Sequence, residues 1–394
     1  MNQIEVPFKN KSSCSGCKAC LEICPKNAIQ MEEDEYGFLY PAIDQNKCVN
    51  CRLCEKTCSF NNLEIQTNRV EGTAFGAAMK DKQALLNSSS GGIFYEAAKY
   101  MIENGGIVYG VEWRDYYQPA FIGVDQLEDL KKLQGSKYVQ ADTNGCYSQV
   151  RDNLQEGRLV LFSGTPCQIA GLYGFLKKNY ENLYVIDIIC HGVPDSKMLK
   201  ADLDLKAKGE NLVKKVSFRD KKKGGWGILG SLELNNGKIL PYDMATSSYY
   251  YYFLKGHLYR DSCYNCEFAG EKRMGDLTIG DFWGSKEVYS DQFDVKAGFS
   301  CVLLNTNKGK ELFSKMQSNL HFILADYDYI RSKNEQLVKH TELTPVRKQV
   351  LDLYQKEGWT GVDRFWKSTV GFQMKKLRLR RAISNLLHEL GIRK

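Results

Sequence analysis

The sequence predicts a protein of the α+β or α/β class, built from a small cysteine-rich unit, a mixed α/β domain with a partly parallel sheet, and a basic C-terminal helix. Two four-cysteine motifs of identical spacing lie near the N-terminus. A strand–helix–strand pattern spans 159–189, and such units hold their strands parallel. The last 24 residues carry seven basic side chains against one acid. We therefore expect units at 1–70, 71–345 and 346–394.

The two motifs share the spacing C-x2-C-x2-C-x3-C, and only the first is followed by proline, at Pro25, where the second has Ser59. In this pattern three thiolates bind one 4Fe–4S cube and the fourth binds the other cube. The alternative is a zinc site or a disulfide knot, but zinc sites often include histidine and this segment has none. The pattern resembles bacterial two-cluster ferredoxins. The predicted ligands are Cys14, Cys17, Cys20 and Cys58 for one cluster, and Cys48, Cys51, Cys54 and Cys24 for the other.

Composition indicates a soluble globular protein. Of 394 residues, 43% are hydrophobic and 26% charged, and the formal net charge is +7. The 14 cysteines occur without an apolar leader segment, which favours a reducing cytoplasm over a disulfide framework. No stretch approaches the roughly 20 apolar residues of a membrane span. We expect a cytoplasmic protein with no nucleic-acid partner.

After the cysteine-rich unit, a strand is expected at 73–79 and a helix at 93–103, joined by a loop containing Ser89, Ser90, Gly91 and Gly92. A Ser/Gly loop that opens a helix presents amides and hydroxyls to an anion such as a diphosphate. A plain capped helix is the alternative. Strands at 106–111 and 119–124, a loop with Lys137 as its single cation, and a helix at 146–156 follow.

The strand–helix–strand unit at 159–189 places two cysteines at one edge of the sheet. Cys167 and Cys190 each follow the carboxyl end of a strand, where open α/β sheets bind ligands. Cys167 also begins a helix, a position that favours a thiolate. Two buried thiols that pack as small hydrophobes are the alternative.

A helix is expected at 196–208, then strands at 215–218 and in a hairpin at 231–240. The lysine run before the hairpin is either a solvated loop or, with Trp226, a segment that closes over an anionic aromatic ligand. Farther along, Cys263-x2-Cys266 supplies two chelating thiols. With Cys167 and Cys190 they predict a third 4Fe–4S cluster, and a structural zinc is the rival.

The remaining chain carries two more features. The strand at 275–284 ends in a glycine-flanked turn that exposes Asp281 and Trp283, whereas 306–331 is expected to be helical. The final 24 residues place Leu379, Ile383, Leu386 and Leu390 at helical spacing among basic residues. Such a helix lies on an anionic membrane surface, or docks on its own domain or a partner.

These motifs together resemble the beta subunits of coenzyme F420-reducing hydrogenase and related dehydrogenases, an FAD and iron–sulfur family. The resemblance covers roughly 72–305. It implies FAD near Ser89, Ser90, Gly91, Gly92, Lys137, Gly164, Thr165 and Asp281, and it supports the third cluster. The matching stretches are Ser89–Gly92, Gly135–Tyr138, Gly164–Gln168, Cys190–Pro194, Phe218–Lys221, Cys263-x2-Cys266 and Gly280–Gly284.

The resemblance implies an oxidoreductase in which electrons from ferredoxin, or another low-potential donor, pass through the clusters to FAD and reduce an organic substrate. Relatives among bacterial surface-polysaccharide genes suggest a saccharide or lipid-linked substrate. His191 and Lys137 are candidates for proton supply or charge stabilisation at the flavin. One alternative is oxidation or reduction of F420 with electrons relayed to a partner. Another is an electron-transfer subunit without its own substrate, and an oligomer is compatible with each.

Overall fold

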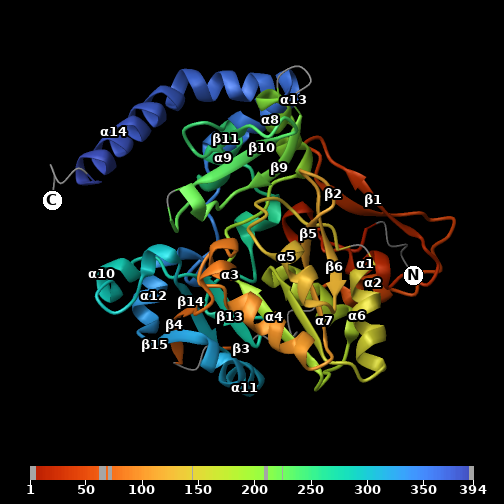
Figure 1. Ribbon diagram of the computed structural model, residues 1–394. Coiled ribbons are helices and arrows are strands. Elements are labelled where there is room, and N and C mark those ends of the chain that lie inside the picture. The colour runs from red at the N-terminus through yellow and green to blue at the C-terminus, as the bar shows by residue number, and fades with distance from the viewer. Residues whose placement is uncertain are drawn as a thin grey trace.

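The computed structural model describes residues 6–61, 68–69, 73–143, 145–207, 212–223 and 225–389. Three parts are visible in Figure 1: a large helix-flanked sheet, a smaller insert of helices and strands above it, and the cysteine-rich unit at the side that carries the N-terminus. The predicted mixed α/β architecture is confirmed.

The central sheet has eight strands, and its middle is parallel. The neighbours β13, β8, β7 and β5 run parallel to one another, and the remaining pairs are antiparallel. The partly parallel sheet is therefore as predicted. In sheet order the strands are β15 (Leu320–Ala325), β4 (Ala74–Met79), β14 (Ser300–Leu304), β13 (Leu277–Asp281), β8 (Leu183–Ile188), β7 (Val160–Gly164), β5 (Ile107–Trp113) and β6 (Pro119–Val124).

Helices cover both faces of this sheet. Side chains alternate along β7, so that Leu161 packs on one face while Val160 and Phe162 pack on the other. Both faces are thus apolar, as expected for a buried parallel strand. One face carries α4 (Ile93–Glu103), α5 (Leu130–Leu133) and α11 (Asn307–Met316), and the other carries α6 (Cys146–Gln155) and α7 (Pro166–Leu176). Shorter helices are α3 (Lys82–Asn87), α10 (Ser285–Tyr289) and α12 (Tyr327–Lys333).

The helical expectation for 306–331 is wrong in part. Residues Leu320–Ala325 form the edge strand β15 between α11 and α12. The strand pairs with β4, some 240 residues earlier in the chain, in register from Leu320 opposite Met79 to Ala325 opposite Ala74. Such a distant backbone partner leaves no local sign in a six-residue apolar stretch.

The insert has its own sheet and core. Its strands are β9 (Val213–Ser217), β10 (Gly230–Leu234) and β11 (Ile239–Tyr242), in antiparallel order β11-β10-β9. The predicted hairpin turn is present, with Gly237 at φ +79°. The helices α8 (Ser196–Lys206), α9 (Ser248–Leu254) and α13 (Pro345–Trp366) share this aromatic core. The first helix of the expected 346–394 extension therefore packs inside the insert.

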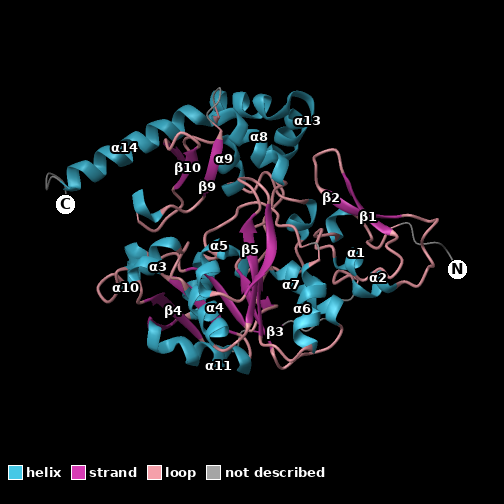
Figure 2. Cartoon of the chain, turned by 45° about the vertical axis from the view of Figure 1, so that its right-hand side comes forward, coloured by secondary structure: helices cyan, strands magenta, loops and turns pink. Residues whose placement is uncertain are grey.

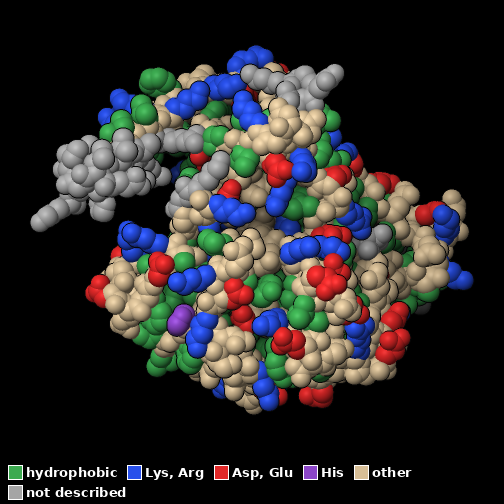
Figure 3. Space-filling model, in the orientation of Figure 1, with side chains coloured by type: hydrophobic (Ala, Val, Ile, Leu, Met, Phe, Trp, Pro, Cys, Tyr) green, Lys and Arg blue, Asp and Glu red, His purple; other side chains and the backbone are tan. Residues whose placement is uncertain are grey.

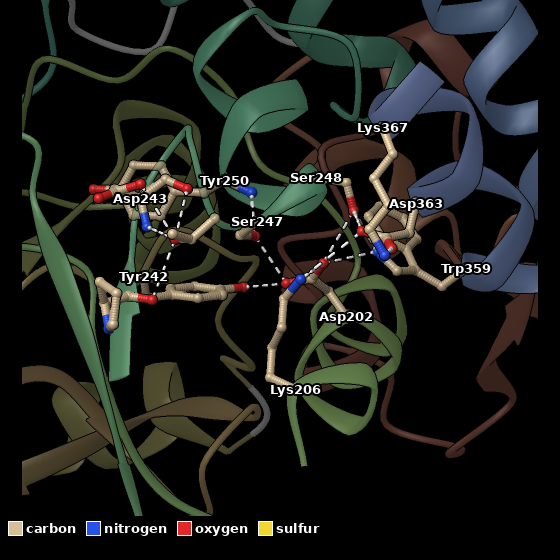
Figure 4. A network of polar contacts seen from close by, with 12 residues as sticks. Asp202, Lys206, Tyr242, Asp243, Ser247, Ser248, Tyr250, Trp359, Asp363 and Lys367 are labelled. Atoms are coloured by element: carbon tan, nitrogen blue, oxygen red, sulfur yellow. Dashed lines mark hydrogen bonds and ion pairs between the residues drawn. The ribbon is translucent and has the colours of Figure 1, made fainter. Parts of the chain in front are cut away.

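A buried polar network joins these helices (Figure 4). The Asp202 carboxylate, wholly buried on α8, accepts hydrogen bonds from Tyr242 (2.9 Å) and Ser247 (2.8 Å). It also accepts bonds from Ser248 of α9 (3.1 Å) and from the indole of Trp359 on α13 (3.0 Å). One carboxylate thus connects elements more than 150 residues apart and satisfies the polar groups of the core.

The two ends of the chain differ in their packing. The N-terminal unit contains α1 (Ala19–Glu22), β1 (Ile29–Glu33), β2 (Leu39–Ile43) and α2 (Leu53–Thr57), and β3 (Asn68–Arg69) pairs with β12 (Lys272–Arg273). At the other end α14 (Phe372–Glu389) projects away from the body in Figures 1 and 2. Leu379 and Ile383 are 63% and 49% exposed, whereas Leu390 lies outside the described residues. Within the described chain, no helix is both long and apolar enough to cross a membrane.

Candidate functional site

The first predicted set of thiols surrounds one cavity. We name these residues the inner quartet: Cys14, Cys17, Cys20 and Cys58. The cavity is also lined by Ser59 and by apolar side chains that include Phe8 and Phe60. The fourth cysteine of this quartet, Cys58, belongs to the second motif, so the quartet has the crossed arrangement that the spacing predicts. The Ser59 hydroxyl is buried here and has no hydrogen-bond partner among the described atoms, so it is available to donate a hydrogen bond to a sulfur of a bound cluster.

The two motifs repeat in backbone geometry as well as in sequence. Gly16 and Lys18 have positive φ angles of 67° and 63° around Cys17. Asn50 and Arg52, at the same positions of the second motif, have φ angles of 52° and 59°. Residues in this left-handed region turn the chain sharply, so that successive thiols point toward one centre.

The second set, which we name the outer quartet, consists of Cys24, Cys48, Cys51 and Cys54. Burial raises the pKa of Cys54 to about 11, and the adjacent Cys24 contributes to the rise. Backbone N–H groups of Ala28 and Asn50 donate to the sulfurs of Cys24 (3.3 Å) and Cys48 (3.4 Å). Cys51 is solvent-exposed, so this quartet lies at the molecular surface.

A third set of thiols meets where the sheet domain, the insert and the inner quartet adjoin. This third quartet is Cys167, Cys190, Cys263 and Cys266. Burial raises the pKa of Cys263 to about 12 and that of Cys266 to about 11, with Cys167 among the causes in both cases. Cys190 is likewise influenced by its three partners. The structure thus brings together the four cysteines that sequence reasoning grouped.

The surroundings of the third quartet fit a sulfur-ligated group. Its four cysteines are partly exposed residues, whereas the two cysteines outside the quartets, Cys146 and Cys301, are buried. Among the described residues, no three His, Cys, Asp or Glu side chains lie close enough to hold one ion. A cube offers a separate iron to each thiolate, so its ligands stand farther apart than those of a single tetrahedral ion. The helix-start effect expected at Cys167 is outweighed, because burial raises the pKa of this thiol.

The quartets follow one another in space. The thiols that influence Cys20 include Cys54 of the outer quartet, and those that influence Cys17 include Cys167 of the third. Gly171 lets Cys17 approach α7, the helix that carries Cys167, because a Cβ at position 171 would lie only 2.8 Å from the Cys17 sulfur. Contacts that hold the cysteine-rich unit in this position include Lys18–Asp142 (2.7 Å), Thr143 to the Cys17 carbonyl (2.6 Å) and Ser148 to Glu22 (3.0 Å).

Beyond the third quartet, a charged aromatic group forms at the ends of β8 and β13. We name it the strand-end cluster: Tyr138, Arg219, Trp226, Asp281 and Trp283. The Arg219 guanidinium donates to both Asp281 oxygens, at 2.7 and 3.0 Å, and the Trp226 indole donates to the same carboxylate at 2.7 Å. Trp226 stacks on Trp283 with ring centroids 5.2 Å apart. The predicted site residue Asp281 therefore lies at its centre.

His191 follows Cys190 and lies close to this cluster. The residue is exposed, yet partial desolvation lowers its pKa, while Asp281 and Glu335 oppose that shift. A neutral imidazole near neutral pH can either donate or accept a proton. The position expected for His191 beside the sheet edge is thus compatible with a role in proton supply.

Lys137 is engaged differently from the expectation. Its ammonium group donates to the carbonyls of Lys132, Leu133 and Gln134, where it caps the end of α5. Desolvation lowers its pKa to about 7. The Gly164–Thr165 turn is also occupied internally, because the Thr165 amide and hydroxyl both donate to the Gln168 side chain. These hydrogen bonds lie within the protein, and the expected role of Lys137, Gly164 and Thr165 at the flavin stays a prediction.

The Ser/Gly loop meets Lys221, the first lysine of the run that precedes the predicted hairpin. Lys221 donates to the carbonyls of Leu85 (2.8 Å) and Ser90 (2.5 Å), and desolvation lowers its pKa to about 7, with Arg219 acting in the same direction. Gly92 begins α4 without a capping side chain, and Arg219 Nε is buried with no partner among the described atoms. Basic side chains also border the boundary between insert and sheet domain in Figure 3. The stretch Phe218–Lys221 was the available signal for Arg219 and Lys221.

Comparison with known proteins finds similarity in both the cysteine-rich unit and the sheet domain. Residues 157–329 match the family described as the C terminus of the coenzyme F420 hydrogenase/dehydrogenase beta subunit, and residues 13–62 match the 4Fe-4S dicluster domain. A coenzyme F420-dependent sulfite reductase of Methanocaldococcus jannaschii is 22% identical over 365 residues, which are 89% of this chain and 54% of that protein. The chain thus spans about half the length of this curated relative. A chain of the F420-reducing [NiFe] hydrogenase complex from Methanosarcina barkeri superposes with a TM-score of 0.47 at 17% identity, over 73% of this chain and 93% of that chain.

Proposed function

Because this chain belongs to the coenzyme F420 hydrogenase/dehydrogenase beta-subunit family and carries a 4Fe-4S dicluster domain, we propose that it is an F420-linked iron–sulfur flavoprotein. In this proposal it exchanges a hydride with coenzyme F420 at the strand-end cluster and relays single electrons to or from a redox partner through three 4Fe–4S clusters. FAD, when bound, converts between hydride transfer and single-electron transfer.

The observation that carries the proposal is the spatial order of the thiols. Helix α1, which carries Cys20, packs against α2, which carries Cys54 of the outer quartet, and against α7, which carries Cys167 of the third quartet. His191 follows Cys190 of the third quartet in the chain, and Asp281 of the strand-end cluster raises the pKa of this histidine. This order supports a continuous route from an exposed surface at Cys51 to an aromatic, charged site.

The proposed flavin site rests on unsatisfied donors. Among the described residues, no side chain caps the N-terminus of α4, so backbone N–H groups of its first turn suit a phosphate, with Lys221 against the same loop. The Gly91 amide before it donates to the Ser300 hydroxyl. The buried, unpartnered Arg219 Nε offers a further donor. We assign Ser89–Gly92, Arg219 and Lys221 to FAD binding, and His191 to proton supply. Asp281 holds Arg219 and Trp226 in place.

The redox partner is proposed to dock at the outer quartet. Cys51 is exposed there, and the neighbouring Val49 is 58% exposed. Ferredoxin or another low-potential carrier suits this terminus. Two alternatives stay predictions. In one, the protein reduces an organic substrate such as a saccharide instead of F420. In the other, it is an electron-transfer subunit without a substrate of its own.

Anaerobic purification with iron, sulfide and flavin analysis tests the proposed cofactors. We expect about twelve irons and one FAD per chain, from three cubes of four irons each. About eight irons would remove the third cluster, and a preparation with full iron and no flavin would overturn the FAD assignment.

A peripheral membrane contact is proposed for α14, because its exposed Leu379 and Ile383 lie among basic residues such as Lys375 and Lys376. We expect the protein to float with liposomes that contain anionic lipid, and to lose this binding when truncated after Val370. Neutral liposomes are the control. Equal flotation of the full and truncated chains would exclude the contact and favour α14 as a docking helix for a protein.

A further inference from the structure

Arg260 is wholly buried and forms no ion pair with a carboxylate among the described residues. The other strongly buried arginines each have one: Arg219 pairs with Asp281, Arg273 with Asp187 and Arg347 with Asp261. An uncompensated charge in the interior is costly, so a buried guanidinium requires a negative partner. The protein must therefore supply the compensating charge for Arg260 from another group.

Arg260 adjoins both the inner and the third quartets. Its Nε donates to the carbonyl of Cys14 at 2.8 Å. Its own carbonyl accepts a hydrogen bond from the Cys263 amide at 3.0 Å, and its amide donates to the Val193 carbonyl, three residues after Cys190, at 2.9 Å. Arg260 thus contacts the backbone at a cysteine of each quartet.

The guanidinium is fixed in this position from several sides. Nη1 donates to the Gln140 amide oxygen at 3.0 Å, and Nη2 donates to the Leu39 carbonyl. The Tyr40 ring lies beneath the cation at 4.2 Å. A Cβ on Gly16 would lie 3.0 Å from the guanidinium carbon, so the first cysteine motif closes directly over it.

We propose that Arg260 is a positioning residue whose charge compensates the two adjacent iron–sulfur clusters and raises the reduction potential of both; this inference rests on the clusters proposed above. A cube with four thiolates is an anion that gains another negative charge on reduction. Net charge and hydrogen bonding set its potential, and a low-dielectric interior strengthens the effect of a nearby cation. Arg260 therefore also lowers the repulsion between two neighbouring reduced clusters.

Three variants separate charge from shape. Arg260→Met removes the cation, Arg260→Lys keeps it, and Gln140→Glu places a carboxylate against Nη1 while the guanidinium remains. Arg347→Met is the control, because Arg347 stacks on Tyr264 and pairs with its own carboxylate. The measurement is an anaerobic potentiometric titration followed by electron paramagnetic resonance, with the outer cluster as an internal reference.

We expect the reduced-to-oxidised ratio of the inner and third clusters to fall at least about tenfold at a fixed potential in R260M, which is 59 mV for one electron. Q140E shifts both clusters in the same direction, whereas R260K, R347M and the outer cluster stay near wild-type values. Wild-type potentials in Q140E, or in R260M with full iron content, would overturn the role of Arg260. If R260M loses its iron, the cluster potentials of Q140E decide whether Arg260 has the proposed role. A wild-type chain that lacks the third cluster would instead refute the proposed cofactors.

Discussion

Replacing Cys263 and Cys266 together by serine is expected to remove about four irons per chain, the content of one cube, and to leave about eight. Both cysteines lie at one short turn around residues Asp261–Asn265, so the double change removes half of the third quartet. A serine hydroxyl is a poor substitute for a soft thiolate ligand. Because the third quartet lies between the inner quartet and the strand-end cluster, the same change separates the two ends of the proposed electron route.

The matched control for this variant is Cys146→Ser. Cys146 is a buried cysteine at the start of α6 and belongs to none of the three quartets. Iron analysis and the electron paramagnetic resonance spectrum of the reduced protein provide the comparison. An unchanged iron content in the Cys263→Ser/Cys266→Ser protein would show that these thiols hold no cluster.

Replacing Asp187 by alanine is expected to destabilise the fold by about 3–5 kcal/mol, the usual cost of leaving one partner of a buried ion pair unpaired. The Asp187 and Arg273 side chains are 0% and 1% exposed and lie 3.0 Å apart. The pair connects β8 with the segment that follows Cys266, and Asp187 also accepts a hydrogen bond from the Met274 amide at 3.2 Å. Without the carboxylate, the Arg273 guanidinium remains charged in the interior.

Anaerobic denaturant unfolding measures this effect. A double variant, Asp187→Leu with Arg273→Met, removes both charges and is expected to recover much of the lost stability, because an apolar pair avoids the desolvation cost. Glu233→Ala, which breaks an exposed pair with Lys214, is the control and is expected to leave the unfolding midpoint unchanged. An Asp187→Ala midpoint equal to that of Glu233→Ala would contradict the assigned importance of the buried pair.

Much of the candidate site was predictable because its ligands follow local rules. The two- and three-residue spacings between cysteines predicted the crossed inner quartet. In the structure Cys58 lines the same cavity as the other three cysteines of this quartet. The strand–helix–strand pattern placed Cys167 and Cys190 at one sheet edge, and chelate spacing added Cys263 and Cys266. Each pair needed only neighbours in sequence or the handedness of one unit, whereas joining the two pairs relied on setting aside the other cysteines and on the family resemblance.

The contributions that were missed depend on distant partners. Arg219 acquires its role from Asp281, 62 residues later, and Lys221 from a carbonyl of the 88–92 loop, 131 residues earlier. Lys137 was expected at the flavin, but its ammonium group finds three carbonyls within five residues, a choice that composition does not reveal. The edge strand β15 likewise depends on its distant pairing with β4.

In the proposed route, electrons pass between coenzyme F420 and the N-terminal clusters through the third cluster. The most direct test is to mix oxidised protein that contains its full iron and flavin with reduced F420 in the absence of oxygen. F420 oxidation and the resonance signals of the reduced clusters are then followed together. We expect F420 to be oxidised and the cluster signals to appear in the wild type, but the inner and outer clusters to stay oxidised in the Cys263→Ser/Cys266→Ser protein. Reduced F420 that persists beside the fully loaded wild-type protein would contradict the account.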